Sequence, residues 1–134
     1  MRMAIIGAAL SFAATHALAL DPAQWQKETA KAYAECSFGA KIVRIGREAG
    51  PKDFQDSRAC VESKIDIAKA NFQSVVPVAS PGGAPALKDY FAAWIGAMRS
   101  IPSFLNMSKR AADMADASNT QRLNELWARY EIGQ

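Results

Sequence analysis

Few side chains in this protein could perform the chemistry of an active site. Its 134 residues include one histidine, His16, and two cysteines, Cys36 and Cys60. Histidine is the usual general base near neutral pH, and a free thiolate is the usual sulfur nucleophile or metal ligand. If His16 is removed with a leader and the two cysteines bond to each other, the sequence excludes serine–histidine and cysteine–histidine catalysis, zinc sites built from histidine and thiolate, and c-type haem attachment.

Carboxylate pairs at helical spacing are the remaining catalytic candidates. The pairs are Glu62 with Asp66, Asp53 with Asp56, and Asp113 with Asp116. Carboxylate catalysis needs one acid kept protonated in an apolar pocket while the other stays ionised. Lysines and helix starts surround these pairs, which favours ionised surface groups. We therefore expect no enzymatic activity, no cofactor and no metal site.

A basic cluster surrounds the predicted end of the first helix. Its members are Lys41, Arg44, Arg47, Lys52 and Arg58. Cations near a helix C-terminus offset the helix dipole and need no partner. The alternative is a binding patch for an anionic partner, such as an acidic protein, a phospholipid surface or a cell-wall polymer. Nucleic acid is not expected, because the cationic excess is small and only Phe54 interleaves with the basic residues.

The first 19 residues have the pattern of a bacterial secretory signal. A basic start at Arg2 precedes an uncharged apolar run, and small residues at Ala17 and Ala19 mark a cleavage site. Cleavage after Ala19 removes His16 and leaves 115 residues, 20–134, with a net charge of +2. We predict that residues 20–134 form a single helical domain without a transmembrane segment, located in the periplasm or secreted.

Apolar residues at three- and four-residue steps predict two helices in the first half of the mature chain. The first begins at Asp21-Pro22, a typical helix start, and ends near Gly46. The second begins at Asp53 and ends before Pro77. Residues 77–85 contain three prolines and two glycines and are predicted to be a connector.

The second half of the chain predicts further helices. One begins near Ala86 and is either kinked or ended by Pro102. A helical stretch over residues 104–115 precedes the capping cluster Ser118-Asn119-Thr120, and a last helix follows through Tyr130. The sequence therefore predicts an all-α, up-and-down bundle of four or five helices.

The two cysteines indicate how the first two helices pair. Facing residues of an antiparallel pair have numbers with a constant sum, and Cys36 and Cys60 sum to 96. Four apolar pairs sum to 97: Val43 with Phe54, Ala32 with Ile65, Thr29 with Ala68, and Trp25 with Phe72. One register of the two helices therefore brings together the cysteines and the apolar pairs. In an exported chain we expect a Cys36–Cys60 disulfide, worth about 3.5 kcal/mol by loop-closure entropy.

The large apolar side chains are expected in the core. Trp25, Trp94 and Trp127 lie on apolar stripes of three different helices, and a ligand-binding box between the helices is the alternative for them. The methionines at positions 98, 107 and 114 are also expected to pack in the core rather than bind copper.

Part of the chain carries a recognisable motif set. It consists of Cys60, Asp66 and Asn71, followed after the proline-rich connector by Leu87, Ala93-Trp94-Ile95 and Arg99. In these residues, about a third of the chain, the protein resembles the bacterial exported family of lysozyme-inhibitor-like proteins. The resemblance implies a small helical domain with an inhibitory role.

These observations together predict an exported, non-catalytic helical protein that recognises a protein partner in the cell envelope. A disulfide-closed helical hairpin suits that role, because rigidity lowers the ordering cost of binding. One alternative is an inhibitor or immunity protein against a lysozyme, an amidase or a similar toxin. Others are a carrier of a small apolar ligand and a carboxylate-based hydrolase of glycans.

Overall fold

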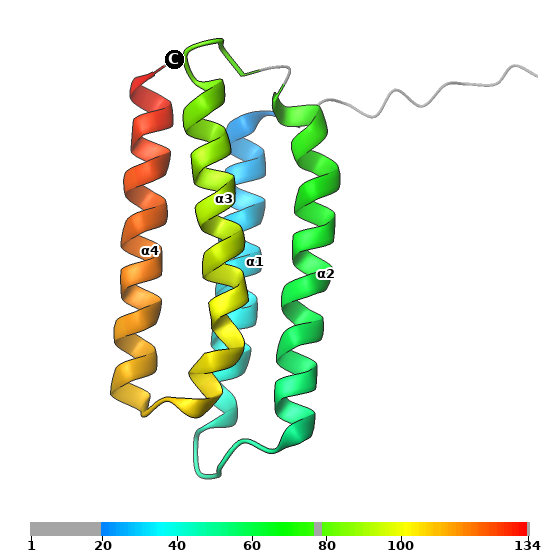
Figure 1. Cartoon of the computed structure of the whole chain (residues 1–134), viewed down its shortest axis with the longest axis vertical. Helices are drawn as coiled ribbons and strands as arrows, with labels where there is room; N and C mark the ends of the chain where they lie inside the picture. Colours follow the sequence, from blue (N-terminus) through cyan, green and yellow to red (C-terminus); the bar gives the residue numbers. More distant parts are fainter. Residues whose placement is uncertain (1–19, 77–78, 134) are drawn as a thin grey trace, which may run out of the picture.

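Four long helices run up and down beside one another in chain order (Figure 1). The computed structural model describes residues 20–76 and 79–133, so the predicted signal segment, 1–19, lies outside the described residues. The elements are α1 (Pro22–Val43), α2 (Pro51–Val75), α3 (Ala84–Ser100), the 3₁₀ helix η2 (Ile101–Asn106) and α4 (Lys109–Ile132). The all-α bundle is confirmed, with four α-helices in the described part of the chain.

Three of the helices begin with a proline in the first turn, where no backbone N–H is needed. α2 begins at Pro51, two residues before the predicted start, and the Gly50 N–H donates to Asp53 Oδ2 at 2.8 Å. The turn between α1 and α2 passes through Gly46, whose φ of 87° suits glycine because it has no Cβ.

The predicted break at Ser118-Asn119-Thr120 is wrong, because α4 continues through these residues without interruption. The cap of this helix is Ser108, whose Oγ accepts from the Ala111 N–H at 3.1 Å. No glycine or proline lies between residues 109 and 132. Polar residues alone therefore do not end a helix whose propensity is otherwise high.

Asn119 has a structural role in the middle of α4. Its Nδ2 donates to Tyr33 Oη at 3.1 Å and to Ser100 Oγ at 3.0 Å. These partners belong to α1 and α3, so Asn119 joins three helices through one amide group. Burial is the main cause that raises the pKa of Tyr33, which therefore stays a neutral hydrogen-bonding phenol.

Pro102 ends α3 rather than kinking it. The α-helix stops at Ser100, and Pro102 is the second residue of η2. Ile101, Phe104 and Leu105 in this short turn are buried, so η2 closes one end of the core.

The centre of the bundle is built from aromatic rings. The ring of Trp25 lies 5.2 Å from those of Phe72 and Phe91 and 5.7 Å from that of Tyr90. Trp94 is fully buried and its Nε1 donates to the Thr29 carbonyl at 2.8 Å. Trp25 and Trp94 are thus core anchors, as predicted, and Trp127 is half-buried at the edge.

The prediction for the methionines is only partly right. Met98 is fully buried and Met107 is half-buried, but Met114 is 63% exposed. The seven-residue step from Met107 to Met114 crosses the start of α4 at Ser108, so it is not a stripe of one helix. In the first turns of α4 the buried position is Ala112, and a residue two positions later points away from the core.

The predicted disulfide is confirmed. Cys36 of α1 and Cys60 of α2 are bonded, with their Cα atoms 5.9 Å apart. The contact between Trp25 and Phe72 follows the same register at the far end of the hairpin. The register inferred from residue sums is therefore the one that the helices adopt.

Candidate functional site

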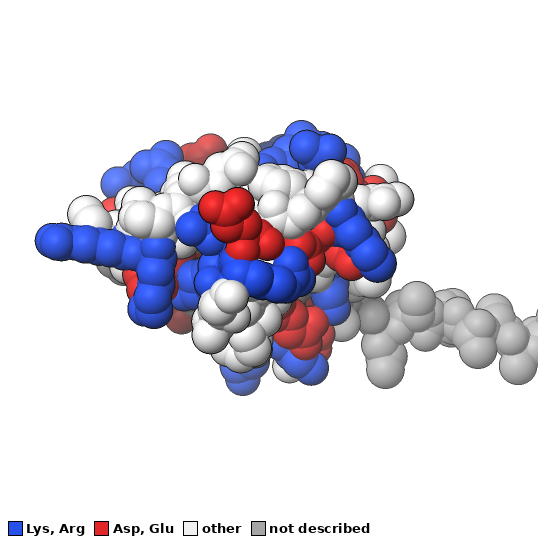
Figure 2. Space-filling model, turned by 90° about the horizontal axis from the view of Figure 1, so that it is seen from below, with Lys and Arg blue, Asp and Glu red and all other residues white. Residues whose placement is uncertain are grey.

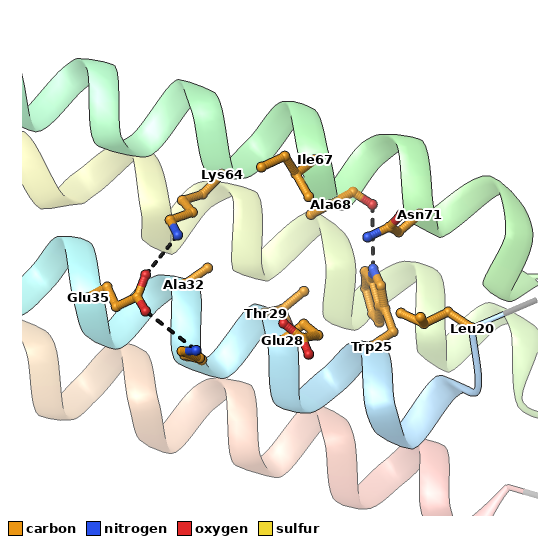
Figure 3. Close-up of a pocket in the computed structure, with 11 residues that line it drawn as sticks. Leu20, Trp25, Glu28, Thr29, Ala32, Glu35, Lys64, Ile67, Ala68 and Asn71 are labelled. Atoms are coloured by element: carbon orange, nitrogen blue, oxygen red, sulfur yellow. Dashed lines mark hydrogen bonds and ion pairs between the residues drawn. The ribbon is translucent and has the colours of Figure 1, made fainter. Parts of the chain in front are cut away.

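A groove of about 260 Å³ follows the seam between α1 and α2 (Figure 3). Its floor contains Ala32 and Ala68, whose small side chains leave space between the two helices. Trp25 closes the floor at one end, where its Nε1 donates to the Ala68 carbonyl at 3.4 Å. The rim contains four charged residues with two apolar residues and one amide: Glu28, Lys31, Glu35, Lys64, Leu20, Ile67 and Asn71.

An ion pair bridges the two walls of this groove. Lys64 Nζ lies 2.7 Å from Glu35 Oε2 (Figure 3). Lys31 lies 3.9 Å from the same carboxylate. The hydrogen bond from Lys64 lowers the pKa of Glu35, so this rim carboxylate stays ionised. The groove is open, and its size suits a single apolar group rather than an enclosed ligand.

A smaller hollow of about 160 Å³ lies further along the same seam, beside the disulfide. It exists because Gly39 has no side chain, and a Cβ built there would meet no atom within 4 Å. Ser57 lines the hollow, and its buried Oγ has no hydrogen-bond partner among the described residues. The seam thus contains two separate depressions divided by the Glu35–Lys64 pair.

An apolar stripe stands on the side of α1 that faces away from the core. It consists of Phe38, Ile42 and Ile45, which are 63%, 47% and 74% exposed. Phe38 and Ile42 lie four residues apart on one face of α1. Ile45 lies just past the end of the helix, where its N–H donates to the Ile42 carbonyl. The stripe was missed in the sequence because the inward apolar positions of the same helix dominate its pattern. The signal was a second apolar repeat, out of phase with the first.

Most cations of the predicted basic cluster form ion pairs or hydrogen bonds with other residues of the protein. Lys41 Nζ lies 2.6 Å from Asp116 Oδ2 and 3.4 Å from Asp113 Oδ1. The guanidinium of Arg44 donates to the carbonyl of Leu105, at 3.0 Å, and to that of Met107. These two cations therefore attach the end of α1 to η2 and α4.

The cations beyond the α1–α2 turn are paired as well. Arg47 donates two hydrogen bonds, of 2.7 and 2.8 Å, to Asp53, and these lower the pKa of that carboxyl. Lys52 lies 2.8 Å from Asp56. Arg58 is exposed and forms no ion pair within residues 20–76 and 79–133. Acidic side chains are accordingly interspersed with the basic ones at this end of the bundle (Figure 2).

The carboxylate pairs are exposed or half-buried, and each pair has a member in an ion pair with a lysine or an arginine. Lys109 is the main cause that lowers the pKa of Asp113, and Glu62 Oε1 lies 3.6 Å from Arg99 Nε. A general acid needs a raised pKa, which is the opposite of the shifts at Asp53 and Asp113. Nothing in this geometry favours acid catalysis by these pairs.

The described part of the chain has no helix with the length and apolarity needed to cross a membrane, and it has no cluster of acidic, histidine or cysteine side chains placed to hold a metal ion. Comparison with family models, curated proteins and solved structures finds no match to this chain.

Proposed function

We propose that this protein is an exported, non-catalytic binding protein whose partner is another protein of the cell envelope. The observation that carries the proposal is the apolar stripe of Phe38, Ile42 and Ile45. Apolar anchors at this spacing are the recurring signature of helix-mediated recognition between proteins. The Cys36–Cys60 disulfide supports export, because structural disulfides persist in oxidising compartments.

The size of the stripe indicates what kind of interface it serves. Its three side chains expose on the order of 300 Å², taking about 150–250 Å² for a fully exposed large side chain. A stable interface buries about 800 Å² on each partner, with an apolar centre and a polar rim. The stripe is therefore the apolar centre of a larger contact, and the charged residues around it supply the rim.

Affinity capture of the mature protein from an envelope extract tests this proposal. We expect one partner in stoichiometric amount with the wild-type protein, and its loss from the Phe38→Ser/Ile42→Ser variant. The double variant removes buried apolar contact at the centre of the interface, where truncation costs most. Gel filtration of the complex measures the stoichiometry.

A Lys69→Ser/Lys88→Ser variant is the matched control, because both lysines are exposed on other helices. It should capture the partner as well as the wild type does. If the wild-type protein captures no stoichiometric partner, even after chemical crosslinking, the proposed function is wrong.

The resemblance to lysozyme-inhibitor-like proteins suggests the class of partner. A lysozyme, an amidase or a similar hydrolase would be inhibited by the mature protein at a one-to-one ratio. The motif tryptophan, Trp94, is fully buried, so an inhibitory contact would have to use other residues. Inhibition that survives the Phe38→Ser/Ile42→Ser substitution would place the inhibitory surface elsewhere.

The groove between α1 and α2 suggests a second candidate function, carriage of a small apolar ligand that would place one apolar group in it. Its floor is small and apolar, and Ile67 stands exposed on its rim. Filling the floor with an Ala32→Leu substitution would block such a ligand. A ligand that is extracted from the wild-type protein but not from this variant would favour the carrier function.

A further inference from the structure

The outer face of α1 has two halves of different chemistry. The exposed positions along this face are Gln24, Lys27, Lys31, Ala34, Phe38, Ile42 and Ile45. From Gln24 to Ile42, neighbouring positions in this list are three or four residues apart within α1. Ile45 continues the same face just past the end of the helix, where its N–H donates to the Ile42 carbonyl. The N-terminal half is polar and cationic and the C-terminal half is apolar, with no acidic residue at any of these positions.

The two lysines of this face are available to a partner. Lys27 is exposed and forms no ion pair within the part of the chain that the structure describes. Lys31 is 72% exposed and lies 3.9 Å from Glu35, whose carboxylate is held more closely by Lys64, at 2.7 Å. An external carboxylate therefore has little competition at either ammonium group.

We infer that the outer face of α1 docks an amphipathic helix of the partner protein, with apolar residues over Phe38, Ile42 and Ile45 and carboxylates over Lys27 and Lys31. This inference rests on the proposed function and specifies the chemistry of its partner. The face from Lys27 to Ile45 is about 27 Å long at 1.5 Å per residue, so the docking helix has about five turns. Because the cationic half and the apolar half of this face are separate, the docking helix can match both in only one direction along α1.

A second copy of this protein does not match both halves of the face. An antiparallel pair centred on residue 40 would place Phe38 against Ile42 but leave Lys27 and Lys31 beyond the end of the second copy's α1. An antiparallel pair centred between Ala34 and Glu35 would place Lys31 and Lys27 against Phe38 and Ile42 of the second copy. That arrangement takes ammonium groups out of water with no carboxylate to receive them. A parallel pair would set the lysines of the two copies against each other, which is repulsive.

Two other occupants fit this face less well. Residues 1–19 contain Arg2 and no acidic residue, so they cannot supply the carboxylates. An anionic lipid surface would meet the lysines, but Glu28 and Glu35 flank the same helix and would be pressed against negative headgroups. The chemistry that fits is a protein helix with its acidic residues at one end only.

Two designed peptides test the inference with the mature protein. Both are 18-residue amphipathic helices with isoleucines on one face of one half; the first carries four glutamates in the other half, and the second carries four lysines there. We expect the acidic peptide to bind at least tenfold more tightly in low salt. We also expect it to shift the amide resonances of the α1 outer face. The Lys27→Glu/Lys31→Glu variant should reverse this preference.

The matched control is Lys69→Glu/Lys88→Glu, which changes net charge equally on α2 and α3 and should keep the preference of the wild type. Equal binding of the two peptides, absence of binding, or shifts confined to the α1–α2 groove would overturn the inference. Sedimentation with phosphatidylglycerol vesicles that depends on Phe38 and Ile42 would also overturn it, by assigning the face to lipid. If an envelope partner depends on Phe38 but tolerates Lys27→Glu/Lys31→Glu, this inference fails while the proposed function stands.

Discussion

Two buried hydroxyl groups near the α1–α2 seam have opposite surroundings. Thr29 Oγ1 donates to the Gln26 carbonyl at 2.8 Å and lies 2.9 Å from Tyr90 Oη, so it satisfies two groups at once. Ser57 Oγ is buried without a hydrogen-bond partner in the described residues. A buried polar group without a partner costs free energy, whereas a paired one does not.

We therefore expect opposite effects on the free energy of unfolding. Ser57→Ala should raise it by about 1 kcal/mol, since the substitution removes an unpaired hydroxyl and adds helix propensity. Thr29→Ala should lower it by about 1–3 kcal/mol, because it removes the buried hydrogen bond between Thr29 and Tyr90. Urea denaturation monitored by circular dichroism measures both. A loss of stability in Ser57→Ala comparable to that in Thr29→Ala would contradict the description of the hollow.

Residue types were readable from the sequence, but their long-range partners were not. The cluster around Lys41 was recognised as basic, yet Asp116 lies 75 positions away and no local pattern links the two. Asn119 was expected at a helix start because amide side chains cap helices well. Its actual partners, Tyr33 and Ser100, meet it only after the helices have packed.

At the scale of elements, the α1–α2 hairpin was the most predictable part of the fold. Apolar periodicity gave both helices, and the constant sum of residue numbers gave their register. The disulfide and the Trp25–Phe72 contact lie on that register. The second half was less predictable because Pro102 permits either a kink or an end, and only the packing of Phe104 and Leu105 decides between them.

Removal of the disulfide should weaken the bundle without changing its fold. The Cys36→Ala/Cys60→Ala variant is expected to lower the free energy of unfolding by up to about 3.5 kcal/mol, the loop-closure entropy of the bridge. Helical content should stay the same, because the aromatic contacts around Trp25 hold the same register. Urea denaturation of this variant and of the oxidised wild type gives the difference. An unfolded variant, or one as stable as the wild type, would contradict this assignment.

At the scale of the whole molecule, ion pairs within the chain use most of the charge at the end where α1 meets α2 and η2 (Figure 2). The other helices do not cover the outer face of α1, where Phe38, Ile42 and Ile45 face solvent. Sequence reasoning predicted a binding protein but offered only the basic cluster as a possible binding surface, because exposure depends on which face of α1 the other helices cover. The anionic-partner patch of Lys41, Arg44, Arg47, Lys52 and Arg58 stays a prediction.

The central claim is that the outer face of α1 contacts another protein. Site-specific photocrosslinking tests it most directly, with p-benzoylphenylalanine in place of Ile42 and, as the control, in place of Arg122 on α4. In cells that produce the protein naturally, position 42 should yield one adduct of defined mass, and position 122 should yield none. No adduct at position 42, or the same adducts at both positions, would contradict the claim.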